Sequence, residues 1–242
     1  MVAKLKSASI NQTLRLTSKA ALLTLIVFWL REGGFTAGVT AVFIGIFALF
    51  YLRPTINNVK FLSSAIILAL LPFSVPVASG LAEFSLIVGW GIVLFLILST
   101  KNLLLLKRKN LYRIAHFAII AILSLLLVER FGFTAQAVVF IAMLFIFREF
   151  YIKFSDSDKE RKTLIAATES LIVIETAWIL SFLSIDMFMG AALLTLFVFI
   201  FHDTTLHRIQ GTLDKQTVIR NGVIFSVLAL VIIIFALRGP FL

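Results

Sequence analysis

Two glutamates inside an otherwise apolar stretch are the residues of this sequence most able to do chemistry. Residues 163–183 are long enough to cross a bilayer as a helix, and they contain Glu169 and Glu175. An ionisable side chain costs about 2.5 to 3.5 kcal/mol at the bilayer centre, so it usually faces a partner, a cavity or a transport path. At a rise of about 1.5 Å per residue from Thr163, Glu175 lies about 18 Å deep and Glu169 about 9 Å deep. The stretch therefore predicts a polar centre within the membrane.

Glu175 is the predicted proton-binding or cation-binding group of this centre, and the predicted function is passage of a small solute or ion. Trp178, one turn further along, could wall the site or equally fill the core of a helical bundle. Glu169 could act as a second stop on the path. Because the two glutamates are six residues apart, they face about 120° away from each other on a helix, which weakens a single-file relay.

Pro72 interrupts another apolar stretch, residues 61–78, and adds to the predicted centre. A proline in a spanning helix frees a backbone carbonyl, which protein or water must then satisfy. Aligning the two halves of the chain places Pro72 near the position of Glu175, and both lie near mid-depth. The alternative is that Pro72 and Pro76 only kink their helix, while Glu175 bonds a neighbouring hydroxyl or is protonated.

A second group of polar side chains is predicted at the depth of lipid headgroups. The group consists of His116, His202, Asp203, His207 and Arg208. Asp203 and His207 are four residues apart, so one helical face could present both to a metal or a phosphate. His202 and His207 are separated by about 140°, which spoils a two-histidine metal pair, and no metal or cofactor is predicted.

This headgroup-side group supports an alternative function, either a lipid-handling enzyme or a non-transporting subunit of a membrane complex. The sequence contains no phosphate-binding glycine-rich loop, no nucleophile elbow and no paired catalytic carboxylates at a recognisable spacing. An enzyme is therefore the less favoured class.

Composition restricts the fold to an all-α, polytopic membrane protein. Of the 242 residues, 61% are hydrophobic and only 14% are charged, whereas a soluble domain carries about 25% charged residues. The net charge of +10 is explained by Lys and Arg that flank membrane spans, and no nucleic-acid partner is predicted. Cysteine is absent, which excludes disulfides, thiolate metal sites and cysteine nucleophiles.

Hydropathy predicts about nine membrane spans in a helical bundle that contacts the lipid bilayer. They cover residues 16–30, 35–51, 61–78, 81–100, 114–128, 133–150, 163–183, 187–201 and 222–237. Of the 22 Lys and Arg residues, all but Arg31, Arg130 and Arg238 then fall on one side. This bias predicts a location in the cytoplasmic membrane, with the N-terminus inside and the C-terminus outside.

A short internal match suggests a duplication. Residues 34–37 read Gly-Phe-Thr-Ala, and residues 132–135 repeat these four residues at the same hairpin of two four-helix blocks. The predicted organisation is a basic interfacial segment (1–19), two parallel four-helix repeats (20–109 and 110–209) and a terminal helix (210–242). Small residues at Gly34, Gly38 and Ala135 are expected to let helices approach closely. The partners considered are a second copy of the chain in a homo-oligomer or another membrane subunit.

Two resemblances accompany these patterns. The last 80 or so residues resemble uncharacterised multi-pass membrane proteins of bacteria with reduced genomes, a family without a known function. That likeness is carried by residues 169–171, Glu175, Trp178, residues 180–183 and residues 207–211. Residues 51–58 and 71–72 look faintly like part of the nine-helix UbiA-type prenyltransferases. The paired Asp-rich motifs that bind magnesium and diphosphate in that family are missing here, because Asp156 and Asp158 form the only close aspartate pair.

Overall fold

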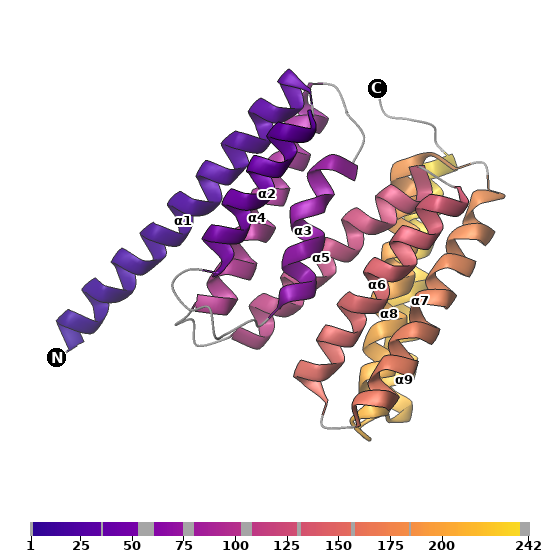
Figure 1. Ribbon diagram of the computed structural model, residues 1–242. Helices are drawn as coiled ribbons and strands as arrows, with labels where there is room; N and C mark the ends of the chain where they lie inside the picture. The colour runs from indigo at the N-terminus through magenta and orange to yellow at the C-terminus, as the bar shows by residue number, and fades with distance from the viewer. Residues whose placement is uncertain are drawn as a thin grey trace. The chain divides into compact units, whose positions relative to one another are not determined.

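The computed structural model describes residues 2–34, 36–52, 61–74, 80–102, 108–129, 132–155, 158–183 and 185–237. Within these ranges the chain forms nine α-helices and no strand, which confirms the predicted all-α class (Figure 1). The helices are α1 (Val2–Gly33), α2 (Ala37–Leu52), α3 (Leu62–Ser74), α4 (Leu81–Asn102), α5 (Arg108–Glu129), α6 (Phe133–Phe154), α7 (Lys159–Ser181), α8 (Met187–Ile209) and α9 (Lys215–Leu237). Pro76, Arg130, Arg238 and residues 53–58 lie outside the described residues.

Six helices of the described chain are long and apolar enough to cross a membrane. The candidate spans are Thr13–Gly33, Glu83–Thr100, Asn110–Glu129, Lys159–Ser181, Met187–Ile209 and Lys215–Phe235. The apolar helices α2 and α3, with 16 and 13 residues, reach only about 24 and 20 Å, less than a hydrocarbon core of about 30 Å. The helices support a membrane location, and the count of nine spans stays a prediction.

The first compact unit, residues 1–119, packs α1 along α4. Gly91 of α4 lies directly against the side chain of Thr24 in α1, and a Cβ at position 91 would collide with the threonine hydroxyl. The close approach expected at Gly34 and Gly38 is wrong, because a Cβ there would meet nothing of the described chain within 4 Å. Gly34 instead takes a left-handed φ of 82°, the conformation that ends a helix.

The second compact unit, residues 120–242, contains α6 to α9 in a sequential up-and-down arrangement (Figure 1). α6 packs on α7, α7 on α8, and α8 on α9. The core is made of apolar side chains on the inward stripe of each helix; it includes Val139, Met143, Phe147, Ala166, Val173, Ala177, Leu194 and Val198. Large apolar residues also cover much of the outer surface, above all on α9, as expected for a protein with lipid as its solvent.

Candidate functional site

Three ionisable or polar side chains meet in the core of the second unit. They are Tyr151 of α6, Glu169 of α7 and His202 of α8, and none is more than 1% exposed. Each occupies the inward stripe of its helix: Glu169, for example, lies one turn from the buried Ala166 and Val173. Because the apolar neighbours on these stripes are buried in the core, the three side chains are brought into the core with them and meet there. We call them the buried triad.

The carboxylate of Glu169 is the centre of the triad. The Tyr151 hydroxyl donates to Glu169 Oε2 at 2.5 Å, and His202 Nδ1 lies 2.9 Å from Glu169 Oε1. The Tyr151 hydroxyl is also 3.2 Å from His202 Nδ1. When the Glu169 carboxyl is ionised it only accepts hydrogen bonds, so the Tyr151 hydroxyl donates to it, and His202 donates in the tautomer that carries a proton on Nδ1. Groups from two other helices therefore hold both oxygens of one buried carboxylate.

Aromatic rings enclose the imidazole of His202. The Phe147 ring stacks on it at a centroid distance of 5.1 Å, and the Phe150 ring meets it edge-on at 4.5 Å. Such apolar walls lower the local dielectric, which strengthens a satisfied polar contact and penalises an unpaired charge. A carboxylate and an imidazole in contact can share a proton and pass it between them, so the triad has the chemistry of an acid–base pair.

Polar contacts tie the helices together at the same end of the unit. Lys162 donates to the backbone carbonyl of Ser155 at 2.7 Å, and Arg148 donates to the Thr163 hydroxyl at 2.9 Å. Gln210 reaches the carbonyl of Phe154 at 2.8 Å. Glu169 lies about 9 Å along α7 from Thr163, so the triad is near the end of the helices that carries most basic residues.

Glu175 and Trp178 lie on the opposite side of α7 from the triad. Both are exposed, and Trp178 is 55% exposed with its ring edge-on to Phe182 at 5.2 Å. This follows from the expected separation of about 120° between the two glutamates, which buries one and exposes the other. The structure therefore does not bring Glu175 together with Glu169, and the role of Glu175 in a solute path stays a prediction.

Pro72 lies in the first unit, buried within α3. It has no N–H for the carbonyl of Leu68, and the Trp90 indole of α4 donates to that carbonyl at 2.8 Å. The Pro72 carbonyl in turn accepts from Arg31 at 3.2 Å, while Arg31 Nε pairs with Glu83 at 2.7 Å. The sequence left open whether protein or water satisfies the carbonyl that this proline frees, and in the structure it is the Trp90 indole that does so.

Within the second unit, the residues of the headgroup-side group do not form one cluster. His202 belongs to the buried triad, whereas Asp203 and His207 turn toward α9, and Arg208 is exposed. His116 is fully buried in the first unit, where its ring lies 5.9 Å from that of Tyr112. Within the described residues no group of three or more His, Asp or Glu side chains is placed to hold a metal ion.

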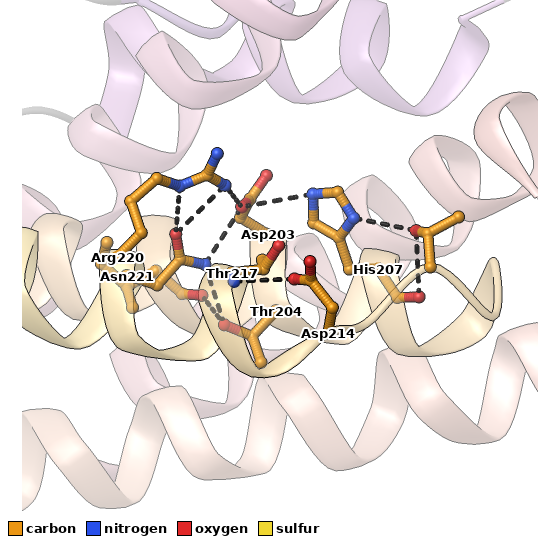
Figure 2. A network of polar contacts seen from close by, with 9 residues as sticks. Asp203, Thr204, His207, Asp214, Thr217, Arg220 and Asn221 are labelled. Atoms are coloured by element: carbon orange, nitrogen blue, oxygen red, sulfur yellow. Dashed lines mark hydrogen bonds and ion pairs between the residues drawn. The ribbon is translucent and has the colours of Figure 1, made fainter.

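Asp203 is the centre of a polar network between α8 and α9 (Figure 2). Asn221, only 4% exposed, donates through Nδ2 to Asp203 Oδ2 at 3.1 Å and to the Thr204 hydroxyl at 3.2 Å. His207 Nε2 and Arg220 Nη2 lie 3.8 and 3.9 Å from the same Asp203 oxygen. Hydrogen bonds of this kind hold apolar helices together in lipid, so the network fastens α9 to α8.

Asp214 begins α9 at the edge of this network (Figure 2). Its carboxylate accepts from the backbone N–H of Thr217 at 2.7 Å, the geometry of a helix N-cap. Hydrogen bonds from Thr217 favour the charged form and lower the pKa of Asp214 below its ordinary value.

Sequence reasoning missed the triad because it separated its members. Glu169 was expected as a second stop on the path of Glu175, His202 was expected as part of the headgroup-side group, and Tyr151 was not among the predicted site residues. The available signal was the helical period, which puts Glu169 in register with small, buried neighbours such as Ala166. That period does not say which inward faces of different helices meet.

Comparison with known proteins gives a family without a function. Residues 58–235 match the family described as "Protein of unknown function (DUF5656)". No curated protein and no solved structure matches the chain. The matched range includes all three members of the buried triad.

Proposed function

The chain belongs to the DUF5656 family, which has no assigned function, so we propose a function from the site. We propose that this multi-pass membrane protein passes a small solute or ion, and that the buried triad is its proton-binding group. One observation carries the proposal. Glu169, 1% exposed, has both carboxylate oxygens bonded by side chains of α6 and α8. Ionisable groups at such positions in membrane helices commonly mark proton relays and ion paths.

Protonation of the triad would change what holds three helices together. With Glu169 ionised, Tyr151 and His202 both donate to it. A proton on the carboxyl removes one strong acceptor and adds a donor, so at least one of the two contacts weakens. Loss of a contact between α7 and either neighbour would loosen the packing near the basic end. The triad thereby provides a link between proton binding and helix rearrangement.

The charge distribution supports the accompanying topology. We place the N-terminus in the cytoplasm and the C-terminus outside, in the cytoplasmic membrane, with nine spans arranged as two four-helix repeats and a final helix. In this topology the triad lies on the cytoplasmic side of mid-depth. Arg31 is the one basic residue of the candidate spans on the outer side, and it is neutralised there by Glu83.

Proton-linked flux in proteoliposomes tests the proposal. Vesicles containing a trapped pH-sensitive dye are challenged with monovalent cations, divalent cations and small anions, one at a time. At least one ion should change the internal pH faster than in protein-free vesicles, and Glu169→Gln should reduce that rate at least tenfold. Glu175→Gln is the matched control, since it neutralises an exposed carboxyl on the same helix and should leave the rate unchanged.

The same experiment separates the competing assignments. If Glu175→Gln abolishes the flux while Glu169→Gln does not, the path runs by Glu175, with Pro72 and Trp178 as its predicted neighbours. If both variants behave as wild type, or if no ion produces a protein-dependent pH change, the proposed transport function is contradicted. The non-transporting alternatives, a complex subunit or a lipid-handling enzyme at the headgroup surface, would then take its place.

A further inference from the structure

One side of α7 forms a continuous exposed stripe. Leu171, Glu175, Trp178 and Phe182 follow one another at intervals of four, three and four residues, so they share one helical face. Leu171, Trp178 and Phe182 are 51%, 55% and 71% exposed. The opposite side of the helix is buried in the core of the second unit. We call these four residues the α7 stripe.

The α7 stripe is apolar except for the carboxyl of Glu175. Large apolar side chains there suit lipid, but an ionisable group within a membrane span is costly unless a polar partner meets it. Within the described residues, no hydrogen bond or ion pair reaches the carboxyl of Glu175, which is exposed on this face of the helix. The described part of one chain therefore gives this carboxyl no polar partner.

We infer that the α7 stripe pairs with the α7 stripe of a second copy of this chain. A neutral carboxyl carries one donor and one acceptor, so two of them can bond each other reciprocally. Copies inserted in the same orientation are related by a two-fold axis along the membrane normal, which brings each residue of the stripe opposite itself. Leu171, Trp178 and Phe182 then pack around the paired carboxyls and exclude lipid from them.

The natural absence of cysteine makes this pairing directly testable by disulfide formation. Leu171→Cys and Phe182→Cys each place one thiol on the stripe, and Val227→Cys places one on α9, where the native side chain is also 54% exposed. Oxidation in membrane vesicles at low protein-to-lipid ratio should give at least five times more covalent dimer for positions 171 and 182 than for position 227. Equal yields at all three positions, or no dimer at 171 and 182, would overturn the inference.

The carboxyl is tested in the Leu171→Cys background. Glu175→Leu should lower the dimer yield at least threefold, because leucine suits lipid but cannot hydrogen-bond, whereas Glu175→Gln should preserve it. Circular dichroism and elution volume confirm that both variants fold. An unchanged yield with Glu175→Leu would contradict the role of the carboxyl. The assay reads association and not flux, so its failure leaves the proposed proton function standing, and the reverse also holds.

Discussion

The indole N–H of Trp90 donates to the backbone carbonyl of Leu68 at 2.8 Å, across the contact between α4 and α3. That carbonyl has no helical donor because residue 72 is proline. Trp90→Phe should therefore lower the free energy of unfolding by about 1 to 3 kcal/mol, since it leaves a buried acceptor unpaired as well as removing ring area. Chemical denaturation in detergent micelles, followed by circular dichroism, measures the change.

Pro72→Ala supplies the control for this prediction. An alanine at position 72 restores the N–H that can bond the Leu68 carbonyl within α3, so Trp90→Phe should cost less in the Pro72→Ala background. If Trp90→Phe costs the same in both backgrounds, the hydrogen bond contributes nothing measurable and Trp90 acts by packing alone.

Tyr151 and Glu169 should be energetically coupled. Tyr151→Phe keeps the ring but removes the donor to a buried carboxylate, which should cost about 1 to 3 kcal/mol. In the Glu169→Gln background the same change should cost less, since the acceptor is then neutral. A double-mutant cycle on the free energy of unfolding gives the coupling, and purely additive effects would show that the 2.5 Å contact is energetically unimportant.

Hydropathy and helical period predicted much of the fold, because both follow from how single helices meet lipid. They predicted the all-α class and placed Glu169 and Glu175 on different faces of α7, about 120° apart. They also showed that the carbonyl freed by Pro72 needs a partner. They did not give that partner as Trp90, nor the meeting of Tyr151, Glu169 and His202. Those contacts depend on which helices place their inward faces against each other, and this pairing cannot be read from a single sequence.

Glycine placement shows the same limit. Gly34 and Gly38 were expected to mark a close helix contact, yet Gly91 makes it, against Thr24. A glycine in an apolar helix indicates that another helix can approach closely at that position. It does not indicate whether another helix is there. At Gly34 the backbone conformation, with its positive φ, is the reason for glycine.

Asp214 should make the start of α9 sensitive to acid. Its pKa in the folded chain is lowered from the ordinary 3.8, so its contribution to stability is present above that value and is lost as pH falls through the lower folded value. Amide exchange at Thr217 should therefore quicken below about pH 4. Asp214→Asn keeps the cap without a titrating group, so amide exchange at Thr217 should not quicken in acid in this variant. If exchange quickens equally in both proteins, a group other than Asp214 is responsible.

Asn221 should hold α9 on α8 through Asp203 and Thr204 (Figure 2). Asn221→Leu removes both hydrogen bonds while suiting the apolar surroundings, and it should lower the free energy of unfolding by about 1 to 2 kcal/mol. Gln216→Leu is the matched control, because it makes the same kind of change at an exposed position of the same helix. Limited proteolysis after α8 should release α9 faster in the first variant only.

The same network distinguishes a structural role from headgroup chemistry. Changing His202 together with Asp203 and His207 would also destroy the buried triad, so the informative variant is Asp203→Asn with His207→Gln. We expect this pair to weaken the attachment of α9 as Asn221→Leu does, and to leave proton-linked flux within twofold of wild type, because neither residue touches Glu169. An altered lipid profile in cells carrying the double variant, with α9 still firmly attached, would instead support a lipid-handling function at this end of the molecule.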